Sequence, residues 1–190
     1  CKVGCSWCDT KESWSSFSYP KIKIETLAKE TAIANSNGAS LLIITGGEPL
    51  HHNLTPLCEA IRKVMSFPNI KNMPIHIETS GVDPISGSPD WITLSPKRHF
   101  PPRAEIVKNC QEIKVIIHTK EDIIFAERIA QEATKTNSVR ETNSKSAFTP
   151  LLFLQPRWGS KAGEALAMEH VMKNPKWRLS LQTHKWLNID

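Results

Sequence analysis

C-K-V-G-C-S-W-C, residues 1–8, places three cysteines on one short loop in the spacing C-x3-C-x2-C. Three thiolates this close together suit an iron–sulfur cluster. A cubane takes four ligands, so three from the protein leave one iron open to another molecule, and that iron would be the reactive position. The loop therefore predicts that Cys1, Cys5 and Cys8 hold a [4Fe-4S] cluster.

A structural zinc site is the competing interpretation, because zinc also binds clustered cysteines but needs four closed nitrogen or sulfur ligands. The loop contains no fourth Cys or His, and the next histidines along the chain are His51 and His52. A disulfide framework fits less well, since 5 cysteines in 190 residues are sparse and odd in number. The spacing favours a cluster and leaves zinc as the alternative.

The composition is that of an ordinary globular protein. Of 190 residues, 39% are hydrophobic and 23% are charged, which is typical of one domain with its own core, so we expect a single domain over residues 1–190. No apolar run approaches the roughly 18 residues of a membrane helix, and no secretory signal is visible. We therefore expect a cytoplasmic protein without a membrane partner, whose thiols stay reduced.

The formal net charge is +5, but the lysines and arginines are scattered, and no basic block with interleaved aromatic residues occurs. This pattern disfavours nucleic acid as a partner. An anionic substrate or an acidic electron donor is compatible with the charge.

Hydrophobic periodicity predicts strands that alternate with helices. Apolar residues recur at helical spacing in four stretches, 24–31, 54–65, 123–133 and 162–172. Short apolar or alternating runs predict strands at 41–44, 75–79, 91–94, 112–117, 151–154 and 177–181. The first of these strands is continuously apolar, which predicts burial. Residues 134–147 are polar and without period, which predicts a surface loop or a disordered insertion.

Two details of the second predicted helix can be tested directly. Asn53 precedes it and is a plausible cap. Cys58 lies within its apolar stripe, so we interpret this cysteine as a small buried hydrophobe and not as a fourth cluster ligand.

Strands alternating with helices imply crossover connections and a parallel sheet. Gly46, Thr79, Ser95 and Gln155 each follow or end a predicted strand, and α/β sheets and barrels bind their ligands at that edge. We predict an α/β fold, a curved and incomplete (β/α) barrel with parallel strands.

The cysteine loop is followed by T-G-G-E-P at residues 45–49, and the two motifs in this order resemble the radical S-adenosylmethionine superfamily. More narrowly, the chain resembles the 7-carboxy-7-deazaguanine synthase family. The motifs that carry this resemblance are C-D-T-K at 8–11, E-T-S-G at 78–81, S-P-K at 95–97, Q-P at 155–156 and the ending R-L-S-L-Q-T-H-K-W-L-N-I at 178–189. The likeness runs from end to end.

The superfamily resemblance implies a radical-SAM barrel whose cofactors are a [4Fe-4S] cluster and S-adenosyl-L-methionine. Glycines at 46 and 47 permit close backbone approach, and the Glu48 carboxylate can accept hydrogen bonds from the ammonium of the methionine group. The residues expected along the S-adenosylmethionine site are Trp7, Asp9, Gly46, Gly47, Glu48, Gly81, Ser95, Pro96, Lys97, Gln155 and Pro156.

The narrower resemblance implies a carbon–nitrogen lyase that converts 6-carboxy-5,6,7,8-tetrahydropterin to 7-carboxy-7-deazaguanine with loss of ammonia, a step of queuosine and deazapurine biosynthesis. It also implies that Thr10 binds Mg²⁺, that Thr79 contacts the pterin, that a flavodoxin-like protein supplies the electron, and that the chain is a homodimer. The family places a strand ahead of its first cysteine and this chain shows none, so we expect an N-terminally truncated sequence with that strand missing.

Two other functions stay open on the sequence. A glycyl-radical activating enzyme also carries C-x3-C-x2-C, but its substrate is a protein, and the motifs at 78–81, 95–97 and 182–185 favour a small molecule. The alternative from a different class is a zinc-stabilised binding module without catalytic activity.

Overall fold

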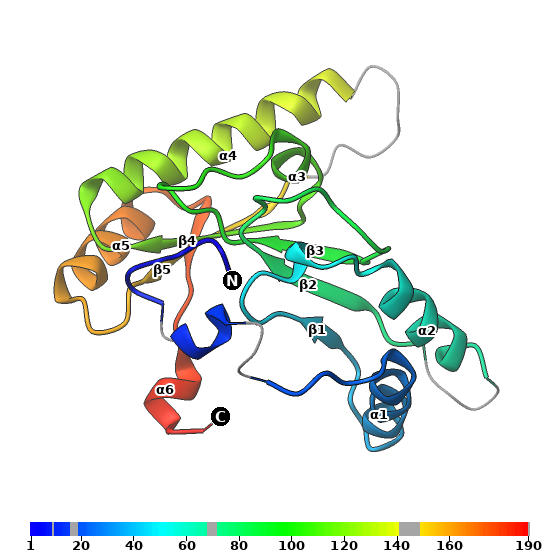
Figure 1. Cartoon of the computed structure of the whole chain (residues 1–190). Helices are drawn as coiled ribbons and strands as arrows, with labels where there is room; N and C mark the ends of the chain where they lie inside the picture. The colour runs from blue at the N-terminus through cyan, green and yellow to red at the C-terminus, as the bar shows by residue number, and fades with distance from the viewer. Residues whose placement is uncertain (9, 16–18, 68–71, 141–148, 190) are drawn as a thin grey trace. The chain divides into compact units, whose positions relative to one another are not determined.

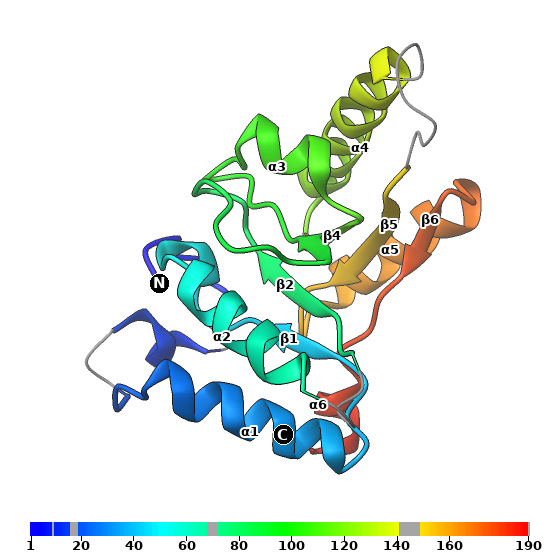
Figure 2. The same cartoon turned by 90° about the vertical axis from the view of Figure 1, so that its right-hand side faces the viewer.

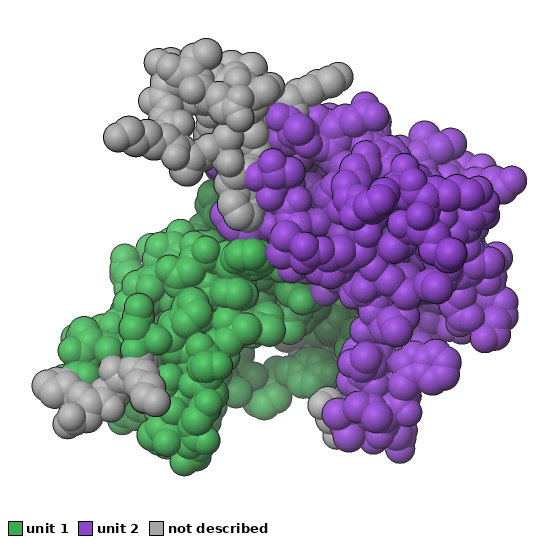
Figure 3. Space-filling view, turned by 180° about the vertical axis from the view of Figure 1, so that it is seen from behind, with its two compact units in different colours: residues 1–93 green, residues 94–190 purple. Residues whose placement is uncertain are grey.

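The computed structural model describes residues 1–190 except 9, 16–18, 68–71, 141–148 and 190 (Figure 1). The chain divides into two compact units, Cys1–Thr93 and Leu94–Asp190, which Figure 3 shows in different colours. The expectation of one domain over the whole length stays a prediction. No helix among the described residues is both long enough and apolar enough to cross a membrane.

The first unit carries a parallel strand pair and two packed helices. Its elements are η1 (Lys11–Trp14), α1 (Ile24–Ser36), β1 (Leu42–Ile44), η2 (Pro49–His51), α2 (Thr55–Met65) and β2 (Ile75–Thr79), with β3 (Trp91–Leu94) at the boundary. β1 and β2 run parallel, with Ile44 beside Ile77. α1 and α2 lie side by side in both views (Figures 1 and 2).

The second unit continues the same alternation. Its elements are α3 (Ala104–Asn109), β4 (Glu112–Ile117), α4 (Lys120–Arg140), β5 (Leu151–Pro156), α5 (Lys161–Lys173), β6 (Trp177–Leu179) and α6 (Thr183–Leu187). β5 pairs in parallel with β4 on one side and with β6 on the other. α4 packs on β4, and α5 packs on β5 and β6. Parallel neighbours joined through helices are the crossover connections predicted from the sequence.

Burial alternates along β2, β4 and β5, so each of these strands has one buried, mainly apolar face. In β2 the buried positions include Ile75 and Ile77, and in β4 they are Ile113, Val115 and Ile117. The residues between them are only half-buried and include polar side chains, such as Glu78 in β2 and Lys114 in β4. The apolar core therefore lies on one face, while the other keeps polar groups within reach of water or a ligand.

Most predicted elements are confirmed, including α2 and α5. The cap position of α2 is Leu54 and not Asn53 as predicted, but Asn53 lies directly before it, and its Oδ1 accepts a hydrogen bond from the Thr55 amide at 3.0 Å. The predicted burial of the first strand is wrong: Ile43 is 48% exposed, because β1 is the end strand of the sheet and has only one neighbour in it.

The prediction of an irregular segment over residues 134–147 is wrong for its first half, because α4 extends to Arg140. Residues 141–147 lie outside the described part of the chain. The buried apolar face at Ala126, Ile129 and Ala133 stabilises the first part of this helix. Once a helix is nucleated, each further residue adds a backbone hydrogen bond, so polar residues can extend it. The short helices α3 and α6 were not predicted, since neither is long enough to show a helical period.

Candidate functional site

The cysteine loop packs directly against the glycine turn at residues 45–49, within the first unit. A Cβ atom built on Gly47 would lie 2.8 Å from the Cβ of Cys1 and 3.1 Å from the carbonyl oxygen of Ser13. Real Cβ atoms do not approach so closely, so only glycine lets the two segments touch. This contact places the first predicted ligand at the turn that follows β1, the edge where the sequence analysis predicted the site.

The loop itself is a compact turn. The Cys8 amide donates to the Cys5 carbonyl at 3.0 Å, which holds the last two cysteines at the ends of one turn. Cys5 and Val3 are buried, whereas Cys1 and Cys8 are half-buried, and none of the five cysteines of the chain forms a disulfide. Trp7 is half-buried in the same turn. The loop thus presents three reduced sulfur groups, and two of them keep contact with solvent.

The donor set fits a cluster better than a single metal ion. Among the described residues, no three His, Cys, Asp or Glu side chains lie close enough together to hold one ion. A structural zinc needs such a group, because all four of its ligands bind the same atom. A cubane binds each cysteine through a different iron, so its ligand sulfurs are spaced more widely. Three cysteines without a disulfide lie within eight residues, and two of them are only half-buried, so the thiolate donors that a cluster needs are present in one loop.

Thr10 lies beside the last predicted ligand. Its Oγ1 is 4.0 Å from the sulfur of Cys8, and its carbonyl accepts hydrogen bonds from the amide and the hydroxyl of Ser13. Thr10 is exposed, as a magnesium ligand shared with substrate and water would have to be. Its binding of Mg²⁺ stays a prediction, and Asp9 lies outside the described residues.

Glu48 joins the glycine turn to the end of β2. Its side chain is buried, and both carboxylate oxygens are in use. Oε1 accepts from the Leu50 amide at 3.1 Å and from the Thr79 hydroxyl at 2.5 Å. Oε2 accepts from the Ser80 amide at 2.7 Å and from the Ser80 hydroxyl at 2.5 Å. The carboxylate therefore holds two of the predicted motifs together, a role that the sequence analysis did not assign to it.

This network also bears on Thr79 and Gly81. The Thr79 hydroxyl donates to Glu48 and accepts from the Gly81 amide at 2.9 Å, while Gly81 has a φ of 76°, which favours glycine. The polar atoms of Glu48 and Thr79 already have hydrogen-bond partners in the protein, so a ligand would have to bind beside these partners or replace them. Their roles toward S-adenosylmethionine and pterin stay predictions.

A second link to the cysteine loop runs through His51, the last residue of η2. Its Nε2 accepts from the Lys2 amide at 3.0 Å, and its Nδ1 is in short contact with Oδ2 of Asp83. The sequence analysis gave His51 and Asp83 no such role. The only local signal was the position of His51, two residues after the T-G-G-E-P motif.

The second unit carries the remaining predicted site residues, directly after β3 at the boundary and at the end of β5. Ser95 and Pro96 follow β3, and the Lys97 ammonium turns back to donate to the Ser95 carbonyl at 2.9 Å and the Ser95 hydroxyl at 2.7 Å. Gln155 and Pro156 end β5, where the Gln155 side chain accepts from the Ser180 hydroxyl at 3.4 Å. Their contacts with a cofactor stay predictions.

The two other cysteines are structural. Cys58 is 1% exposed, as predicted for a buried hydrophobe, and Cys110 is also buried. Burial raises the pKa of the Cys110 thiol to about 12, so this group stays protonated at neutral pH. Both thiols are buried, whereas reactive thiols are exposed.

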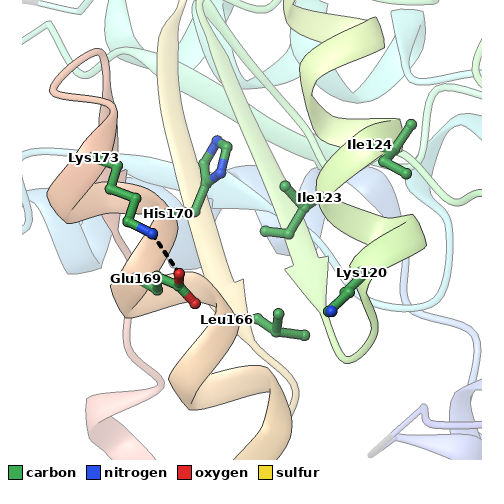
Figure 4. A pocket seen from close by; sticks show the side chains of 7 residues that line it. All are labelled: Lys120, Ile123, Ile124, Leu166, Glu169, His170 and Lys173. Atoms are coloured by element: carbon green, nitrogen blue, oxygen red, sulfur yellow. Dashed lines mark hydrogen bonds and ion pairs between the residues drawn. The ribbon is translucent and has the colours of Figure 1, made fainter.

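A hollow of about 400 Å³ lies between α4 and α5 in the second unit (Figure 4). Its walls combine apolar side chains, such as Ile123 and Leu166, with the ion pair between Lys173 and Glu169. None of the predicted site residues lines it. The hollow is therefore separate from the residues that carry the motifs.

This chain is similar in sequence to a known enzyme family. Residues 1–94 match the model of the radical SAM superfamily. A 7-carboxy-7-deazaguanine synthase from Prochlorococcus marinus is 53% identical over all of this chain and 85% of the relative. The enzyme of the same name from Flavobacterium psychrophilum is 41% identical over all of this chain and 79% of the relative.

A solved structure matches as well. The crystal structure of QueE from Escherichia coli aligns with 96% of this chain and 81% of that chain, with a TM-score of 0.67 and 24% sequence identity. At this identity the match shows the fold. The predicted fold class, an α/β chain of parallel strands with the pattern of an incomplete radical-SAM (β/α) barrel, is confirmed.

Proposed function

Because this chain belongs to the 7-carboxy-7-deazaguanine synthase family of radical S-adenosylmethionine enzymes, we propose that it converts 6-carboxy-5,6,7,8-tetrahydropterin to 7-carboxy-7-deazaguanine with release of ammonia. The structural observation that supports this most strongly is the contact of Cys1 with Gly47. It brings the cysteine loop onto the turn at which a radical SAM enzyme is expected to hold its nucleotide cofactor.

The cysteine loop would bind the cluster, and the glycine turn would position it. Cys1, Cys5 and Cys8 would hold a [4Fe-4S] cluster and leave one iron free of protein ligands. With S-adenosylmethionine bound, the reduced cluster would supply one electron for cleavage of that cofactor, which would provide the 5′-deoxyadenosyl group. The protein positions these groups: Gly47 admits the cysteine loop, and Glu48 keeps the glycine turn fixed to the end of β2.

The finer assignments are part of the same proposal. Thr10 binds Mg²⁺ together with substrate oxygens and water, which its exposure and its place beside Cys8 support. Thr79 contacts the pterin at the end of β2. The electron comes from an acidic, flavodoxin-like donor, which the formal net charge of +5 favours, and the active form is a homodimer.

Anaerobic reconstitution with iron and sulfide tests the proposal. We expect the broad visible absorbance of a [4Fe-4S] cluster, close to four irons per chain, and conversion of carboxytetrahydropterin to 7-carboxy-7-deazaguanine and ammonia in equal amounts. The matched control is the double replacement Cys58→Ala and Cys110→Ala, which removes two cysteines outside the loop and should keep the cluster. Replacement of Cys1, Cys5 and Cys8 by Ala should abolish it.

Two outcomes would contradict the proposal. A colourless protein that binds only zinc would identify a binding module. If 5′-deoxyadenosine forms only when a partner polypeptide is added, and not with carboxytetrahydropterin, the chain would be an activating enzyme for a glycyl radical.

A further inference from the structure

We propose that His51 and Asp83 form a positioning pair that holds the cysteine loop in place by accepting the amide hydrogen of Lys2, the residue next to the first ligand. The inference rests on the proposed function, since it assumes that the loop carries a cluster. It assigns a task to two residues that belong to none of the motifs recognised in the sequence.

The geometry joins three segments that lie far apart in the sequence. His51 Nε2 is 3.0 Å from the Lys2 nitrogen, and its Nδ1 contacts Asp83 Oδ2 directly. The His51 side chain is 18% exposed and that of Asp83 is 35% exposed, so the contact between them is partly buried, while the hydrogen bond to the Lys2 amide is open to solvent. The His51 amide also donates to the Glu48 carbonyl at 3.2 Å, which fixes its backbone to the glycine turn.

Hydrogen-bond chemistry defines the state of the imidazole. The Lys2 amide can only donate, so Nε2 must carry a lone pair and accept. The remaining nitrogen, Nδ1, then carries the hydrogen and points it at the Asp83 carboxylate, which can only accept when it is ionised. A carboxylate that holds a histidine in one tautomer and one orientation is how proteins prepare an imidazole to serve as a fixed acceptor.

The position of the pair explains why it matters. Lys2 is bonded to Cys1 in the chain, and Cys1 in turn packs on Gly47, so a shift of the Lys2 amide moves the first ligand sulfur. The pair therefore acts on the cluster through the loop and does not touch it. Without the acceptor, the Lys2 amide loses this fixed partner, and the first ligand is held less firmly.

Two pairs of variants separate positioning from general stability. His51→Ala and Asp83→Ala remove the acceptor and its support. His51→Gln keeps an acceptor oxygen close to the place of Nε2, and Asp83→Asn keeps an oxygen that accepts from Nδ1. His52→Ala, which removes the exposed imidazole one residue further on, is the matched control.

The reconstituted full-length protein is mixed anaerobically with an iron chelator, and iron release is followed by absorbance. We expect His51→Ala to lose iron about tenfold faster than the wild type, the factor that corresponds to one hydrogen bond. Asp83→Ala should be intermediate, while His51→Gln, Asp83→Asn and His52→Ala should stay within about threefold of the wild type.

The inference fails if His51→Ala releases iron at the rate of His52→Ala, or if His51→Gln is as fast as His51→Ala. It also fails if the melting temperature of the metal-free His51→Ala chain falls far enough below that of the wild type to account for the faster release of iron. The histidine would then only stabilise the fold. A wild-type chain that binds no cluster would instead refute the proposed function, and the inference about His51 and Asp83 would then be rejected as well.

Discussion

A missing side chain at residue 47 decides whether the first cysteine can reach the site. Cys1 and the Ser13 carbonyl both lie against the α-carbon of Gly47, at distances that leave no room for a methyl group. Neither neighbour is the end of a flexible side chain, so a larger residue would have to push the loop backbone away. The requirement for glycine here is steric, since Gly47 is not among the glycines with positive φ.

Gly47→Ala should therefore reduce the iron content of the reconstituted protein to well below that of the wild type, with a loss in the free energy of unfolding of about 1–3 kcal/mol from overpacking. Iron analysis and urea unfolding measure the two effects. Gly38→Ala is the control, because Gly38 has a φ of 105° but open space around its α-carbon. It should lose stability and keep its cluster. Normal iron content in Gly47→Ala would contradict the steric argument.

Glu48 is the second residue on which the site depends, because four hydrogen-bond donors converge on its buried carboxylate. Glu48→Ala leaves those donors buried without an acceptor. We expect a loss in the free energy of unfolding of about 3 kcal/mol or more, measured by urea unfolding of the metal-free chain. Glu59→Ala, on the exposed face of α2, should change it by less than about 0.5 kcal/mol. Equal losses in the two variants would exclude the network as a source of stability.

At the scale of elements, Glu127 joins α4 to α5 and β6 in the second unit. Its Oε1 accepts from His170 Nε2 at 2.8 Å and Trp177 Nε1 at 2.7 Å, and its Oε2 accepts from Lys176 Nζ at 2.6 Å. Burial alone raises the pKa of the Glu127 carboxyl, but the hydrogen bonds from Lys176, His170 and Trp177 outweigh it, and the net pKa lies below the ordinary value.

A lowered carboxyl pKa stabilises the fold above the pKa of the unfolded chain, about 4.3, and the stabilisation is lost as the pH falls through the folded pKa. Glu127→Gln should therefore cost about 1–3 kcal/mol of unfolding free energy at neutral pH and show a weaker decline below about pH 4.3 than the wild type. Urea unfolding at a series of pH values measures this. Glu132→Gln removes an exposed pair on the same helix and should follow the wild type. If the free energy of unfolding of Glu127→Gln falls below about pH 4.3 as steeply as that of the wild type, another carboxyl group causes the loss.

For the molecule as a whole, the apolar cores lie in the strands. Ile75 and Ile77 are fully buried in the first unit, as are Ile113 and Leu154 in the second. None of these contacts requires a metal ion. The fold should therefore persist when the cluster is absent, unlike that of a domain built around structural zinc.

Removal of iron with a chelator should leave the far-ultraviolet circular dichroism nearly unchanged and the thermal transition cooperative, with a melting temperature that falls as expected for the loss of a bound ligand. The same treatment of a zinc-stabilised module would unfold it. Loss of secondary structure on chelation would thus favour the zinc alternative over the cluster enzyme.

Local patterns in the sequence were sufficient for the elements and for the chemistry of the loop. Apolar residues with a period of two or of about 3.6 identify the buried face of a strand or helix without reference to its neighbour, which is why β2, β4, α2 and α5 were predicted. The ligand spacing of Cys1, Cys5 and Cys8 is equally local, because all three lie within eight consecutive residues.

Only the tertiary structure decided which of these local features meet. Glu48 accepts hydrogen bonds from Thr79 and Ser80, and His51 contacts Lys2 and Asp83. These partners are far apart in the sequence, and no periodicity predicts them. These partners depend on how the backbone returns from α2 to the edge of β2 and on which polar atoms are then left buried and in need of a hydrogen bond. Burial patterns show that a residue faces inward, but the partner it meets there is set by the packing of the whole unit.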